Sequence, residues 1–268
     1  MDFFSLLNSQ LPFFAQTFLV AISGLILGSF ASLLSHRLCT KQPIVIARSE
    51  CPKCHSKLKI RNLIPLFSWI LQRGKCSNCK QNISIRYPLI EMSFAIFFVI
   101  VFLVCKQIDQ RLILLCGITF TLILMSITDL EHYFIPDIAQ YLLAFFVILL
   151  RINDDGTYGA LVNLKAAFAY MGFGLLMLIF FYITVKIEAI GIDDIKFFFL
   201  AGLLLGMHNF LFFMLLIGIL GAFFGIAWEK LKHDKTFPFG PPICLALYIC
   251  MLFGDHINPI ETFGSLIF

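Results

Sequence analysis

Four cysteines in the first third of the chain have the spacing of a metal site. Cys51 and Cys54 form one C-x-x-C pair in CPKC, and Cys76 and Cys79 form a second in CSNC after 21 intervening residues. Each pair can present two thiolates to one ion, and four thiolates suit the tetrahedral coordination of Zn²⁺. Since protein ligands then fill all four positions, we predict a structural zinc ion and not a catalytic one. Two disulfides are the alternative, which a reducing compartment disfavours.

Two groups of aspartates lie where apolar segments begin or end. Asp129 follows one apolar block in ITDLEHYFIPD, and Asp193 and Asp194 precede another in GIDDIK. If one carboxylate from each group met across a helix bundle, the pair could share a proton and activate water, as aspartyl proteolysis requires. The same acids suit a proton- or cation-coupled transporter, and a single acid at such a position is more often a helix cap. The residues alone therefore leave protease and transporter open.

The elements that hold these residues are predicted to be membrane-spanning helices. Of the 268 residues, 60% are hydrophobic and 13% charged, a balance that excludes an ordinary soluble domain. A spanning helix needs about 20 apolar residues. This rule predicts eight spans, near residues 11–35, 88–105, 112–128, 138–150, 166–185, 195–207, 209–228 and 240–254.

We therefore expect an all-α polytopic membrane protein of about eight transmembrane helices with a small zinc-binding insert. The expected division is a first transmembrane helix at 1–35, the zinc-binding insert at 36–87 and a seven-helix membrane domain at 88–268. The insert carries eleven basic residues and one acidic residue, so the positive-inside rule predicts that it is cytoplasmic. Counting spans from there predicts that Asp129 and Asp194 also lie on the cytoplasmic side. The net charge of +4 then reports topology and attraction to anionic lipid, and we expect no nucleic-acid partner.

An ordered series of motifs resembles the type IV prepilin peptidases, which belong to the GxGD class of intramembrane aspartyl proteases. The series runs along nearly the whole chain: GSFASLLSHR, RSECPKC, NLIPLFSWILQRGKCSNC, ISIRYPLIE, the segment from Asp129 to the IPD sequence, GIDDIK and FPFGPP. By position, Asp129 matches the first catalytic aspartate and Asp194 the second, with Gly191 in the first place of GxGD. Asp193 stands where that pattern has its second glycine, which adds a negative charge beside the pair and leaves Asp193 as a stand-in. Ser32 stands where asparagine is usual.

The resemblance implies an enzyme of the bacterial cytoplasmic (inner) membrane. Such an enzyme cuts the basic leader from prepilins and pseudopilins at the cytoplasmic membrane face, and many members then N-methylate the new N-terminus with S-adenosylmethionine. Glu91 matches a family glutamate and is a candidate for the methyl-transfer site, with an ion pair to Arg86 as the alternative. Asp193 and Lys196 are further candidates for the substrate or methyl-transfer site. A zinc-stapled membrane assembly protein without catalysis is the remaining interpretation.

The basic leader needs an attractive surface, because the insert itself is basic. We expect that Asp193, Glu131 and Asp137 together form an acidic surface near the catalytic pair.

Overall fold

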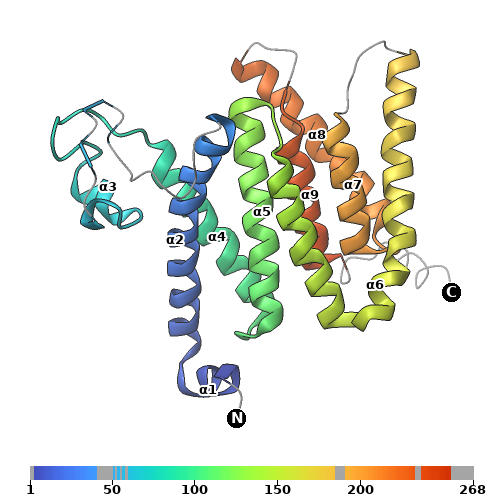
Figure 1. The fold of residues 1–268 in the computed structure, drawn as a ribbon, viewed down its shortest axis with the longest axis horizontal. Coiled ribbons are helices and arrows are strands. Elements are labelled where there is room, and N and C mark those ends of the chain that lie inside the picture. The colour runs from blue at the N-terminus through green and yellow to red at the C-terminus, as the bar shows by residue number, and fades with distance from the viewer. Residues whose placement is uncertain are drawn as a thin grey trace. The chain divides into compact units, whose positions relative to one another are not determined.

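The computed structural model describes residues 3–40, 51, 53–54, 56–57, 60–184, 191–232 and 237–254. Within these residues the named elements are all helices (Figure 1). They are α1 Phe3–Gln10, α2 Phe13–Thr40, the 3₁₀ helix η1 Ile60–Asn62, α3 Phe67–Leu71, α4 Arg86–Cys105, α5 Gln110–His132, α6 Asp137–Thr184, α7 Ile192–Leu205, α8 Phe210–Lys232 and α9 Gly240–Phe253. The predicted all-α class is confirmed.

Among the described residues, five helices are long and apolar enough to cross a membrane. They are α2, α4, α5, the Leu161–Thr184 part of α6, and α8. The other predicted spans coincide with the first part of α6, with α7 and with α9. Helices α7 and α9 have 14 residues each, which gives about 21 Å of rise against an apolar core of about 30 Å. The multi-pass character is confirmed, whereas the count of eight is not.

The chain forms two compact units, residues 1–120 and 121–268. The predicted division at 35 and 87 stays a prediction. In the first unit, α2 and α4 pack backbone to backbone: a Cβ added at Gly24 would lie 2.7 Å from Ala95 Cα, and one at Gly28 would lie 2.9 Å from Glu91 Cα. Glycine at these two positions therefore permits the close approach of the helices.

In the second unit, Gly156 divides α6 into two parts. Its φ of 68° and ψ of −176° are not helical, and Figure 1 shows α6 turning back on itself. The second part packs on α7, where a Cβ at Gly202 would lie 2.7 Å from Ala167 Cα, and Tyr170 Oη donates to the Gly206 carbonyl at 3.1 Å. Helix α9 contacts both α7 and α8. These contacts hold the starts of α7 and α9 in the same unit as the end of α5.

Candidate active site and candidate metal centre

Asp129 lies in the last turn of α5, and its side chain is buried, with 7% exposed. Its Oδ2 accepts a 2.7 Å hydrogen bond from the N–H of Gly240, the first residue of α9. Pro241 and Pro242 follow and have no N–H, so Gly240 carries the one backbone donor of the first three residues of this helix. The start of a helix also favours negative charge. The N-terminus of α9 thus binds the Asp129 carboxylate.

The lack of a side chain at Gly240 is required by this contact. A Cβ there would lie 2.7 Å from Asp129 Oδ2 and 3.0 Å from Asp129 Cγ. Sequence analysis noted FPFGPP as a motif but assigned no role to its glycine. The Gly-Pro-Pro sequence could have indicated a helix start at Gly240. Its hydrogen-bond partner Asp129, however, lies 111 residues earlier in the chain.

Asp194 lies in the first turn of α7 and is also buried, with 8% exposed. Its Oδ2 accepts a 2.9 Å hydrogen bond from the N–H of Gly191, and its own N–H donates to the Gly191 carbonyl at 3.2 Å. This reciprocal pair caps the helix and fixes the carboxylate at its N-terminus. Each of the two predicted catalytic aspartates therefore accepts a backbone N–H at a helix start.

The structure brings Asp129 and Asp194 together. The two carboxylates are close enough to interact electrostatically, and both also interact with the Cys244 thiol of α9. Two full negative charges repel in a medium with little water, and this repulsion favours a state in which one of the two carboxyls is protonated. The pair has the charge arrangement of an acid–base dyad.

Asp193 directs its carboxylate to Lys196. Lys196 Nζ binds Asp193 Oδ1 at 3.0 Å and Asp137 Oδ1, at the start of α6, at 2.8 Å. The Asp193 charge also acts on Asp194, so Lys196 partly offsets the charge that the departure from the GxGD pattern introduces. The expected acidic surface is weakened in the same way, because Lys196 binds two of its three members. Gln140, which sequence analysis missed, joins α6 to α7 by donating to the Asp193 carbonyl at 3.1 Å.

Glu91 of α4 lies in the first unit and is buried, with 7% exposed. Its Oε2 accepts a 2.6 Å hydrogen bond from the N–H of Leu66 in the insert. Arg86 donates to Ser35 Oγ at 2.8 Å and to Ser32 Oγ at 3.2 Å, both on α2. Ser32, at the position where the resemblance leads one to expect asparagine, is thus a hydrogen-bond partner of α4.

The four insert cysteines come together as predicted. Their Sγ atoms all lie within 4.8 Å of one another, and those of Cys51 and Cys79 are 3.9 Å apart. Tetrahedral Zn²⁺ with bonds of about 2.3 Å to sulfur needs sulfur atoms about 3.8 Å apart, so the cluster fits this ion. All nine cysteines are free in the structure.

Local hydrogen bonds already favour thiolates in this cluster. Bonds from the side chain and backbone of Ser56 lower the pKa of Cys54 to about 6, and backbone N–H groups of Cys79 and Asn78 lower the pKa of Cys76. At Cys79 a backbone hydrogen bond from Gln81 lowers the pKa, but burial and the other three thiols outweigh it and raise the pKa to about 11. Four thiolates therefore repel one another at this spacing, and a divalent cation would remove the conflict.

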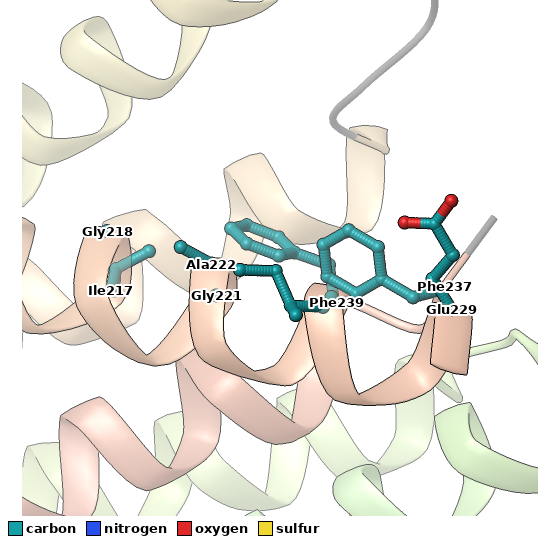
Figure 2. A pocket seen from close by; sticks show the side chains of 9 residues that line it. Ile217, Gly218, Gly221, Ala222, Glu229, Phe237 and Phe239 are labelled. Carbon is teal, nitrogen blue, oxygen red and sulfur yellow. The ribbon is translucent and has the colours of Figure 1, made fainter. Parts of the chain in front are cut away.

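A cavity of about 450 Å³ opens along α8 beside the candidate active site. Figure 2 shows two aromatic rings, Phe237 and Phe239, over a floor of small residues, with the Glu229 carboxylate at one end. The floor includes Gly218, Gly221, Ala222 and Gly225. Phe239 directly precedes Gly240, so this groove, lined by α8 and residues 237–239, ends one residue from the amide that binds Asp129.

Comparison with known proteins finds two matching family models. Residues 22–105 match the bacterial peptidase A24 N-terminal domain, and residues 112–226, which include both aspartates, match the type IV leader peptidase family. Three relatives are named prepilin leader peptidase/N-methyltransferase. That of Aeromonas salmonicida is 30% identical over 90% of this chain and 91% of its own, that of Bacillus subtilis 30% over 88% and 94%, and that of Stutzerimonas stutzeri 29% over 88% and 90%. No solved structure matches significantly.

Proposed function

Because this chain belongs to the type IV leader peptidase family, we propose that Asp129 and Asp194 are the catalytic pair with which it cleaves prepilin leader peptides. The chain is a prepilin leader peptidase and N-methyltransferase of a multi-pass membrane type. The observation that carries the catalytic assignment is the pairing of two buried carboxylates from α5 and α7. Each accepts a backbone N–H at a helix start, so each is fixed in position before substrate arrives.

The chemistry follows from one proton shared by two carboxylates. The ionised carboxylate takes a proton from water while the water oxygen attacks the scissile carbonyl carbon, and the protonated carboxylate donates its proton to the carbonyl oxygen. When the tetrahedral intermediate collapses, the C–N bond breaks and a proton passes to the leaving amine. The pair again holds one proton, and the amine is free to accept a methyl group.

The test is cleavage of a purified prepilin by the full chain in lipid nanodiscs. Asp129→Asn and Asp194→Asn should each reduce cleavage by about 10³-fold or more, since each removes a member of one acid–base unit. Asp155→Asn is the control, because Asp155 is an exposed acid of α6 that pairs with Arg151 and has no part in the candidate site; we expect it to retain activity within about threefold, since an exposed ion pair contributes little. Thermal unfolding of each variant must match that of the parent chain. Substantial cleavage by either of the first two variants would exclude this assignment.

The groove along α8 supports a place for the substrate. Its apolar lining suits an apolar segment, and Gly218, where an added Cβ would meet no described atom within 4 Å, leaves room for one. The rings of Phe239 and Phe237 already lie against Gly221 and Gly225. Glu229, about 12 Å along the helix axis from Gly221, offers a negative charge for a basic leader. We infer that the apolar segment following the cleavage site lies along the groove, with the leader directed toward Glu229.

The cysteine cluster is proposed to hold a structural Zn²⁺ that stabilises the insert, bound by Cys51, Cys54, Cys76 and Cys79. The charge distribution supports a cytoplasmic position for the insert and for both aspartates. We also propose pseudopilins as substrates, and S-adenosylmethionine supplies the methyl group. The hydrogen bond from Leu66 to Glu91 supports a positioning role for Glu91, whereas its part in methyl transfer, like the parts of Asp193 and Lys196 in substrate binding, stays a prediction.

A further inference from the structure

The insert exposes apolar side chains although its sequence is strongly basic. Helix α3 has no buried residue, and Phe67, Ile70 and Leu71 are 60%, 55% and 81% exposed. These three positions have the i, i+3, i+4 spacing of one helix face. Leu63 and Ile64, just before the helix, are 42% and 47% exposed. We call these five residues the α3 apolar face.

The opposite side of α3 is fixed to the insert itself. Trp69 Nε1 donates to the Ile83 carbonyl at 3.2 Å, and its ring lies against Gly74, where an added Cβ would be 3.0 Å from the Trp69 ring. Trp69 therefore orients α3. The α3 apolar face is left without protein cover among the described residues.

A strained turn fixes the depth at which α3 begins. Leu66 has φ 60° and ψ −53°, and the N–H of Phe67 donates to the Pro65 carbonyl at 2.6 Å, which defines a classic γ-turn. The N–H of Leu66 itself donates to Glu91 Oε2. Glu91 lies about 8 Å along α4 from its first residue, Arg86. The start of α3 is thus level with the apolar part of α4, a candidate membrane span.

The position of Glu91 along α2 also indicates that the start of α3 lies at the depth of the membrane spans. The backbone of Glu91 lies against Gly28, and α2 continues to Thr40, about 18 Å farther along its axis. On α4, the side chains of Leu89, Met92 and Ile96 are exposed and apolar, as expected of residues that face lipid. The α3 apolar face therefore begins at the depth of a lipid-facing surface.

The charges around α3 fit an anionic membrane surface. Residues 51–87 contain no aspartate or glutamate. The basic side chains of Arg61, Arg73, Lys75 and Lys80 are exposed. Basic residues near an anionic surface are attracted to it, and burial of apolar area in the interface adds to this attraction.

We propose that the α3 apolar face inserts into the interfacial layer of the bilayer that the spans cross, with the surrounding basic residues on anionic headgroups. The Glu91–Leu66 hydrogen bond then ties the start of α3 to α4, and lipid contact holds its apolar face at the membrane. The occupant of the surface is lipid, and a second copy of the chain or a bound prepilin is the competing outcome.

The test is site-specific photocrosslinking of the full chain in nanodiscs that contain anionic lipid. Leu71→p-benzoylphenylalanine places the probe on the α3 apolar face, and Ser77→p-benzoylphenylalanine places it on an exposed polar position of the same insert as a matched control. We expect lipid adducts, identified by mass, at least fivefold more abundant from position 71 than from position 77. Replacing anionic with zwitterionic lipid should lower the yield at position 71 at least twofold.

Chain-to-chain adducts or adducts with added prepilin in place of lipid adducts at position 71 would overturn the proposal, as would equal lipid yields from the two positions. A yield unaffected by lipid charge would overturn the role of the basic residues. Because both substituted positions are exposed, the thermal unfolding and metal content of the two variants should match those of the parent chain. If the variant at position 71 differs, the probe is placed at Ile70 of the same apolar face; if the control at position 77 differs, the probe is placed at the exposed Gln81.

Discussion

Gly240→Ala tests the link between α9 and the catalytic pair most directly. The added Cβ would lie 2.7 Å from Asp129 Oδ2, well inside van der Waals contact, so either the carboxylate or the start of α9 must shift. The shift lengthens the 2.7 Å bond from the Gly240 N–H. A hydrogen bond to a charged group contributes about 1.5–3 kcal/mol, and each 1.36 kcal/mol is about tenfold in rate. We expect kcat for prepilin cleavage to fall about 10- to 100-fold with KM nearly unchanged.

Gly191→Ala is the matched control, because Gly191 also donates its N–H to a catalytic carboxylate. There the added Cβ would lie 3.4 Å from Asp194 Oδ2, an ordinary contact with the nearest described atom, and the φ of −77° suits alanine. We expect kcat within about threefold of the parent chain, since the 2.9 Å hydrogen bond is kept. Both enzymes are assayed at saturating prepilin in nanodiscs, with thermal unfolding measured in parallel. If Gly240→Ala cleaves normally, or if Gly191→Ala is equally impaired, the steric reasoning is refuted.

Three further predictions concern the groove, the helix packing and the metal. Gly218→Leu should raise KM for prepilin about 5- to 30-fold, because the new side chain fills the groove while an added Cβ meets open space and displaces no packed atoms. Gly172→Leu is the control, because Gly172 also has open space but lies outside the groove, and its KM should stay unchanged. Equal KM values for the two variants would contradict the groove assignment. Gly202→Val should lower the free energy of unfolding by about 1–3 kcal/mol, since its Cβ would lie 2.7 Å from the α6 backbone, and an unchanged thermal midpoint would contradict this. Zinc affinity, measured by competition with a chelator, should weaken as pH falls because protons compete with the metal for the thiolates. Since the pKa of Cys54 is lowered to about 6, its thiolate should persist to a lower pH than an ordinary cysteine thiolate. Zinc affinity independent of pH would exclude cysteine ligation.

The sequence predicted the helical class well because long apolar blocks have few alternatives in a bilayer. The gap predicted between the spans 138–150 and 166–185 is largely helical in the structure, as part of α6. Polar residues there suggested a loop, yet the chain stays helical on both sides of Gly156, and Arg151 binds Asp155 at 2.8 Å one turn later. Composition averaged over a window cannot distinguish a polar helical turn from a loop.

The apolar face of the insert was missed for a related reason. The insert was treated as polar on its average composition, and α3 has only five residues, too few for a periodic signal. What makes α3 distinctive is its attachment to Glu91, which is 25 residues away in sequence. Patterns within a short window carry no information on such a contact.

The candidate site shows how far motif reasoning reaches. Spacing and resemblance named Asp129 and Asp194, and the structure brings these two together. Neither pattern identified Gly240 or Gln140, because their roles depend on which backbone group meets which side chain after packing. The GxGD pattern specifies glycines before Asp194. In the structure, however, an added Cβ at Gly240 would lie 2.7 Å from a catalytic-site carboxylate oxygen, against 3.4 Å at Gly191, so Gly240 tolerates a side chain less well.

Both aspartates accept a hydrogen bond from the backbone N–H of a glycine at the start of a helix, Gly240 for Asp129 and Gly191 for Asp194. A helix start leaves N–H groups without partners, so a carboxylate placed there gains a hydrogen bond and a favourable dipole. At α9 two prolines remove the competing donors and a glycine leaves room for the carboxylate, so that Asp129 is directed to one amide. Since that amide belongs to the residue after Phe239 of the groove, any movement of residues 237–239 on substrate binding is transmitted to the Asp129 carboxylate through a single hydrogen bond.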